Sequence, residues 1–102
     1  MKRNGMRPVP PGEILSEEFL KPLGLTANAL AKAIGVPPNR ITAILKGERG
    51  ITGDTAIRLG TFFKTSPEFW MNLQMTYDLR NAERALPAGV RRSIEENSNV
   101  LR

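Results

Sequence analysis

The side chains best suited to specific chemistry lie close together in the segment 38–49. They are an amide, an arginine, two small side chains that carry methyl groups, and a lysine: Asn39, Arg40, Thr42, Ala43 and Lys46. An arginine can donate two hydrogen bonds to guanine, and an asparagine can pair with the edge of adenine. Methyl groups of threonine or alanine can contact a thymine methyl, and a lysine can neutralise a phosphate. The segment therefore has the chemistry needed to read duplex DNA.

Catalysis has little support in the composition. The chain contains no histidine and no cysteine, which excludes an ordinary zinc site, an imidazole base and a cysteine or serine–histidine nucleophile. Acids cluster at Glu13, Glu17 and Glu18, but they fit the solvated edge of an amphipathic helix better than a carboxylate site. We therefore expect no enzyme activity, no catalytic residue, no metal site and no cofactor.

The elements that must position the DNA-reading side chains form a helix-turn-helix pattern. A first helix is predicted over about 27–34, because Thr26 is a suitable N-cap and Gly35 suits the left-handed position that ends a helix. The spacing of Ala31, Gly35 and Ile41 supplies the small residue, the turn and the apolar lock of this motif.

The second helix of the motif is the one presented to DNA. Pro37 and Pro38 begin it, since proline suits the first helical position. Its apolar stripe, formed by Ile41, Ile44 and Leu45, is predicted to turn inward. The polar side chains between them are then left to face outward.

Residues that flank the second helix extend the predicted DNA-contacting set. Free backbone N–H groups after Thr26 suit a phosphate, as do Lys46 and Arg49 in the turn 46–50, which lacks the spacing of a nucleotide-binding loop. Two alternatives stay open, a surface salt bridge for Arg40 and a local turn or cap role near Pro37 and Pro38 for Asn39. The full predicted set is Thr26, Pro38, Asn39, Arg40, Thr42, Ala43, Lys46 and Arg49.

The charge distribution favours a nucleic-acid partner over a membrane. The net charge of the 102 residues is +5, and the segment 26–64 alone holds six cations and two acids. No stretch approaches the roughly 18 continuous apolar residues that span a bilayer. The absence of cysteine suits a reducing compartment. We expect a cytoplasmic protein.

The order of apolar patterns predicts an all-α fold with five helices. Helices are expected at about 11–21, 27–34, 38–46, 53–64 and 67–85, and no β-hairpin signal is present. We divide the chain into a flexible basic arm (1–10), a DNA-binding and dimerisation domain (11–85) and a polar C-terminal tail (86–102). The tail is expected to be a frayed helix or disordered.

The last predicted helix carries more apolar side chains than a small core can absorb. Phe69 and Leu73 are expected in the core, and part of the remainder in contact with a second subunit. Two copies are also expected because one helix-turn-helix makes few base contacts, and they would lie about 34 Å apart on DNA. The predicted dimer residues are Trp70, Leu73, Met75 and Tyr77.

Three sequence blocks resemble the HigA family of addiction-module antitoxins, within the lambda-repressor-like helix-turn-helix class. The blocks, which also occur in virulence-associated protein I, are PGEILSEEFLKPLGL, LAKAIGVPPNRITAILKGERGITGDTAIRL and SPEFWMNLQMTYDL. The resemblance implies a five-helix domain that dimerises through its later helices. It also implies that the protein neutralises a small RelE-like toxin, an mRNA endonuclease, and represses its own operon by binding double-stranded operator DNA.

Two other functions remain open from the sequence. The first is a stand-alone helix-turn-helix regulator without a toxin. The second is a module that neutralises a protein partner without binding DNA, which the cluster of positive charge and an outward Arg40 disfavour.

Overall fold

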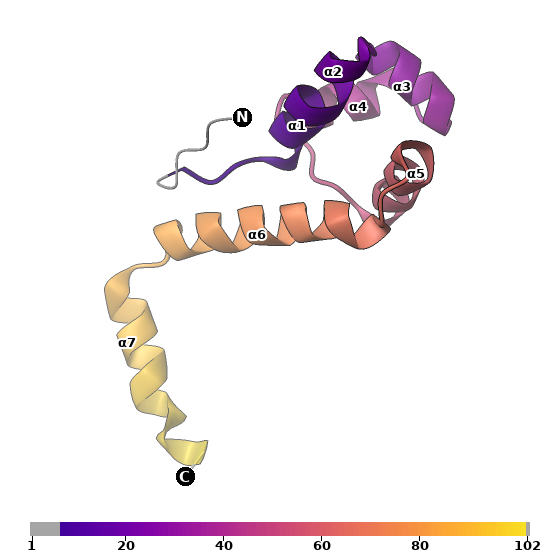
Figure 1. The fold of residues 1–102 in the computed structure, drawn as a ribbon. Helices are drawn as coiled ribbons and strands as arrows, with labels where there is room; N and C mark the ends of the chain where they lie inside the picture. Colours follow the sequence, from indigo (N-terminus) through magenta and orange to yellow (C-terminus); the bar gives the residue numbers. More distant parts are fainter. Residues whose placement is uncertain (1–6, 102) are drawn as a thin grey trace.

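The computed structural model describes residues 7–101, and all regular structure in that range is helical (Figure 1). The first helical run comprises α1 (Pro11–Ile14), the π-helical η1 (Leu15–Leu20) and α2 (Lys21–Leu23). It is followed by α3 (Ala27–Ile34), α4 (Pro38–Leu45), α5 (Gly53–Phe63), α6 (Pro67–Ala85), α7 (Ala88–Asn97) and the 3₁₀ segment η2 (Ser98–Leu101). The predicted all-α helix-turn-helix fold is confirmed. The first six residues of the predicted arm lie outside the described range.

The core forms where α3 packs on α4 and α5 packs on α6. Leu15, Leu30, Ile41 and Leu59 are fully buried there. An aromatic cluster extends this core, because the ring of Phe19 lies 4.8 Å from that of Phe63 and 4.9 Å from that of Trp70. Its apolar contacts connect the first helical run to α5 and α6.

Trp70 belongs to the core of the protomer and not to the dimer surface predicted from sequence. Its side chain is 0% exposed, and Nε1 donates a hydrogen bond of 2.8 Å to Oγ1 of Thr65, which satisfies the buried indole N–H. Leu73 likewise packs against the core, and Tyr77 is half-buried. Of the four predicted dimer residues, Met75 is the one that is widely exposed, at 54%.

An exposed apolar stripe lies on the face of α6 that is turned away from Trp70 and the core. Met71, Met75 and Leu79 follow one another at four-residue intervals and are exposed by 38%, 54% and 57%. Residues separated by four positions lie on the same face of a helix. As expected from the sequence, α6 has apolar side chains that the core does not bury. They lie on the face with Met71, Met75 and Leu79, and not on the face with Trp70 and Leu73.

The C-terminal segment is a helix in the structure, and it stands apart from the domain. Figure 1 shows α7 turning away from the end of α6 with no other helix beside it. Every residue from Asp78 to Leu101 is exposed. Val90 and Ile94 form a small apolar stripe on α7, with exposed fractions of 42% and 60%.

The start of the first helical run presses directly on the second helix of the helix-turn-helix. A Cβ atom added to Gly12 would lie 2.0 Å from the carbonyl oxygen of Ile44 and 3.0 Å from Cα of Leu45. Both contacts are with backbone atoms, so no side-chain movement can relieve them. Only glycine permits this approach of α1 to the end of α4.

We predict that Gly12→Ala destabilises the protein by about 1–3 kcal/mol, because α1 must withdraw from α4. Urea unfolding followed by circular dichroism measures the change. Gly53→Ala is the matched control, since nothing lies within 4 Å of a Cβ at Gly53 in the first turn of α5. Its stability should stay within about 0.5 kcal/mol of the parent. Equal effects of the two substitutions would show that the contact with α4 is not a constraint.

Candidate nucleic-acid interface

The helix-turn-helix consists of α3, α4 and the turn between them. Oγ1 of Thr26 accepts a hydrogen bond of 3.0 Å from the N–H of Ala29, which confirms the predicted N-cap of α3. Gly35 ends that helix with φ 73° and ψ 38°, and the N–H of Val36 donates to the carbonyl of Ala31. The predicted left-handed position is thereby confirmed, and the chain turns immediately into α4.

The buried side chains of α4 determine which residues are presented to solvent. Ile41 and Ile44 are 0% and 1% exposed, whereas Leu45 is half-buried. Residues on the other side of the helix are therefore free to meet a ligand. Among the predicted contacts, Pro38, Asn39, Thr42 and Lys46 are exposed, and Arg40 and Ala43 are half-buried.

The polar groups on α4 differ in how much of their hydrogen-bonding capacity the protein itself uses. Oγ1 of Thr42 donates to the carbonyl of Pro38 at 2.8 Å, so toward a base this side chain offers an acceptor and a methyl group. The N-cap of α4 is Pro37, whose side chain makes no capping hydrogen bond. Asn39 follows in the first turn of α4 and is exposed.

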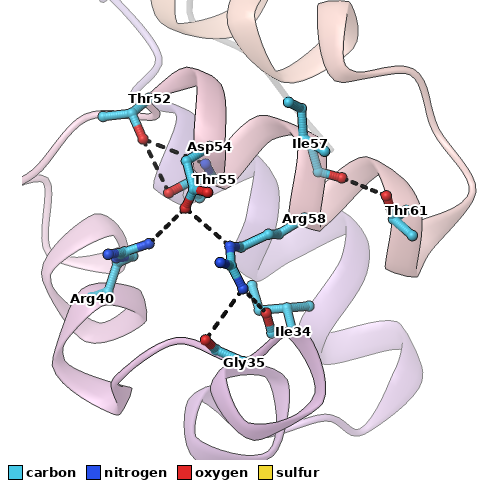
Figure 2. Close-up of polar contacts among 9 residues, drawn as sticks. All are labelled: Ile34, Gly35, Arg40, Thr52, Asp54, Thr55, Ile57, Arg58 and Thr61. Carbon is cyan, nitrogen blue, oxygen red and sulfur yellow. Dashed lines mark hydrogen bonds and ion pairs between the residues drawn. The ribbon is translucent and has the colours of Figure 1, made fainter.

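Arg40 forms a salt bridge, which was the alternative to a DNA contact in the sequence analysis. Its Nη1 lies 3.0 Å from Oδ2 of Asp54 in the first turn of α5 (Figure 2). The contact uses one nitrogen of a guanidinium that carries five N–H donors, and 25% of the side chain is exposed. Donors thus remain for a second acceptor, while the ion pair fixes where the guanidinium lies.

The same carboxylate oxygen also binds Arg58, one turn further along α5. Nε of Arg58 lies 3.0 Å from Oδ2 of Asp54, and its Nη1 donates to the carbonyls of Ile34 and Gly35 at 2.7 and 3.2 Å. Figure 2 shows this network joining the end of α3, the start of α4 and α5. These carbonyls end α3 without helical partners, so Arg58 satisfies them and holds the turn.

Asp54 and Arg58 were not recognised as part of the site from the sequence. Their four-residue spacing indicates a possible ion pair within one helix. The contacts of this pair with Arg40 and with the end of α3 cross 14 and 24 positions of sequence, and no local pattern encodes them.

The remaining predicted contacts lie at the two ends of the motif. Thr26 is exposed at the start of α3, and Lys46 and Arg49 are exposed after α4, where Gly47 turns the chain with φ 77°. The sequence predicts a flexible basic arm over residues 1–10. In its described part, both terminal nitrogens of Arg7 bind the carboxylate of Glu13 at 3.0 and 3.1 Å.

The arrangement suits polyanion binding and provides no reaction centre. One exposed helix face carries an amide, a guanidinium, methyl groups and a lysine, and an α-helix fits the major groove of B-DNA. Within residues 7–101, no three side chains of the metal-binding types gather at one point. No helix in that range is both long and apolar enough to cross a membrane.

Comparison with known proteins identifies relatives that share this motif. A family model described as helix-turn-helix matches residues 17–70. Virulence-associated protein I of Dichelobacter nodosus is 53% identical over 81 residues, covering 79% of this chain and 75% of that protein. A solved addiction module antidote protein of the HigA family from Coxiella burnetii is 55% identical, with a TM-score of 0.75, covering 78% of this chain and 87% of that one. PA4674 of Pseudomonas aeruginosa, in complex with its operator DNA, is 45% identical with a TM-score of 0.83, covering 87% and 96%.

The network around Asp54 yields a prediction about stability. Arg58→Ala should destabilise the protein by about 1–3 kcal/mol, because it removes a charged donor from two carbonyls at the end of α3. Asp54→Ala should cost less than about 1 kcal/mol, since its ion pairs are largely exposed. Urea unfolding of both variants and of Arg49→Ala, which is exposed, measures the difference. A larger loss for Asp54→Ala than for Arg58→Ala would contradict this assignment.

Proposed function

The chain belongs to the HigA-type helix-turn-helix family, and on that basis we propose that it is an antitoxin that binds its own operator DNA as a homodimer. The family is non-enzymatic. The protein acts in the cytoplasm, represses its operon by occupying the operator, and neutralises a small RelE-like toxin.

One observation carries the DNA-binding part of the proposal. The outward face of α4 is polar and basic, and its fold is shared with a relative whose structure contains operator DNA. Asn39 and Arg40 lie at the N-terminal end of α4, which meets base edges first in this motif. Thr42 and Ala43 then contact bases one turn later, and Lys46 reaches a phosphate. Thr26, Pro38 and Arg49 complete the proposed contact surface.

The ion pair with Asp54 gives Arg40 a defined place in this proposal. An arginine that is held in position before binding loses less conformational entropy when it pairs with a base. The carboxylate also places a negative charge beside the proposed DNA surface. It therefore disfavours contacts that do not use the geometry of the guanidinium, which favours specificity over general affinity.

A homodimer is supported by the exposed stripe of Met71, Met75 and Leu79 on α6. Methionine and leucine at four-residue spacing form an apolar strip that a second copy of the same helix can cover. Two copies are also what specific operator binding by a single helix-turn-helix requires. We place the dimer contact on this stripe and retain Met75 from the predicted dimer residues.

The proposed DNA contacts predict different losses for two cations on α4. Arg40→Ala should weaken binding to the operator by about 1–3 kcal/mol and relax base choice at one position, because a base contact is lost. Lys46→Ala should weaken every duplex alike and reduce the slope of log affinity against log salt by about one unit. Titrations of operator and random duplexes at several salt concentrations measure both effects.

Asp54→Asn is the control for Arg40, since it removes the ion pair and keeps the guanidinium. It should still bind the operator, but its preference for operator over random DNA should fall, because binding to random DNA rises. An equal loss on operator and random duplexes for Arg40→Ala would reassign Arg40 to a phosphate contact. An unchanged salt slope would remove Lys46 from the interface.

The antitoxin part predicts a specific protein partner. The product of a short basic open reading frame beside this gene should copurify with the chain when both are expressed together. The same product expressed alone should stop growth, and this chain should restore growth. Footprinting upstream of the gene, with and without the partner, then shows how the complex changes operator binding. Operator binding without any neutralised neighbour would indicate a stand-alone regulator.

A further inference from the structure

We infer that Gln74 is a positioning residue that ties α6 to the loop after α4 and thereby sets the half-site spacing the dimer accepts. The inference rests on the proposed function, because it concerns how the dimer presents its two DNA-reading helices. It adds a residue that lies outside every proposed DNA contact and outside the exposed stripe of α6.

The side chain of Gln74 joins two segments that are distant in sequence. Its Oε1 accepts a hydrogen bond of 2.7 Å from the N–H of Ile51, at the end of the loop that follows α4. Ile51 is 4% exposed and belongs to the core. A buried N–H without an acceptor costs about 1–3 kcal/mol, so the loop has a strong reason to keep this partner.

Asp78 determines which way the amide of Gln74 points. Nε2 of Gln74 donates to Oδ1 of Asp78 at 2.9 Å, one turn along α6. A carboxylate can only accept this bond, and the N–H of Ile51 can only donate. The two neighbours therefore require one orientation of the amide, which presents its oxygen to the loop.

The loop backbone also packs directly on this amide. A Cβ atom added to Gly50 would lie 3.0 Å from Cδ and Oε1 of Gln74 and 3.1 Å from its Nε2. Gln74 and Tyr77 line one hollow together with Gly12 at the start of α1 and with Gly47 and other residues of the loop. The start of α1, the loop and α6 therefore meet around the side chain of Gln74.

This contact completes a chain of rigid connections from the dimer helix to the DNA surface. The exposed stripe that we assign to the dimer lies on the same helix as Gln74. The loop that Gln74 holds includes Arg49, which we assign to a phosphate, and directly follows Lys46. If α6 fixes one protomer relative to the other, the loop anchor at Ile51 transmits that geometry to the C-terminal end of α4.

Spacing between half-sites is the property that such a connection controls. Each α4 reads its own half-site. The distance between the two α4 helices can vary only as far as the attachment of each one to α6 allows. A loosened attachment should leave half-site reading intact and broaden the range of accepted spacings. A purely structural role would weaken all binding together, so the two roles can be separated.

Three variants test the inference on the full-length protein. Gln74→Leu removes both hydrogen bonds, Asp78→Ala removes only the contact that orients the amide, and Thr76→Ala is an exposed control on the same helix. Each is titrated against a half-site duplex, the footprinted operator, and operators with one base pair inserted or removed at the centre. Circular dichroism checks that each variant is folded.

For Gln74→Leu we expect about tenfold weaker binding to the native operator, as for the loss of one to two hydrogen bonds. Half-site affinity should change less than about twofold, and the preference for native spacing should shrink by about the same tenfold. Asp78→Ala should shift the spacing preference in the same direction by about threefold, and it keeps the test decisive if Gln74→Leu does not fold. Thr76→Ala should match the parent.

Two results would overturn the inference while leaving the proposed function intact. One is a parental spacing preference that both variants retain. The other is an equal loss on half-site and operator, which would mean that Gln74 only supports the loop. Failure of the parental protein to bind any of these duplexes would overturn the proposed function and this inference together.

Discussion

An eight-residue helix cannot sustain itself in water, and this constraint governs the architecture around α4. Isolated helices shorter than about 12–15 residues are marginal even with favourable sequences. Only Ile41 and Ile44 of α4 are fully buried, so the helix is stabilised by packing at two points and by its neighbours. The first helical run, α5 and α6 each supply one restraint, and together they hold in place a surface that must stay exposed.

The restraints at the two ends of α4 differ in their physical chemistry. Near the N-terminal end, Arg40 is held by an ion pair with Asp54, whose side chain is 57% exposed, so salt weakens this restraint. At the C-terminal end, the backbone of Gly12 presses on the carbonyl of Ile44, a contact that salt does not weaken. The N-terminal end of α4, which is proposed to read bases, is thus held by a salt-sensitive ion pair. The C-terminal end is held by close packing.

The helix boundaries were largely predictable because local chemistry specifies them. Thr26 and Gly35 act within one turn of their own position, so the sequence alone indicates their roles. The face of α6 that meets the domain was not predictable, since apolar residues lie on both sides of it. The π-helical stretch within the first helical run also has no local marker.

Side-chain contacts between segments distant in sequence were the part of the site that could not be predicted from the sequence. The sequence placed Arg40 outward and offered a salt bridge as its alternative, but it did not identify Asp54 as the partner. Arg58 and Gln74 bind backbone groups, and any residue type can offer a backbone carbonyl or N–H. Such contacts leave no compositional signal at the receiving position, and only the tertiary structure reveals them.

Trp70 has a consequence for how this molecule can be observed. It is the single tryptophan of the chain, it is fully buried among phenylalanine rings, and it lies on the domain-facing side of α6. Its ultraviolet emission therefore reports the integrity of the core. Loss of the core can thus be followed directly in the unmodified protein, without an introduced dye.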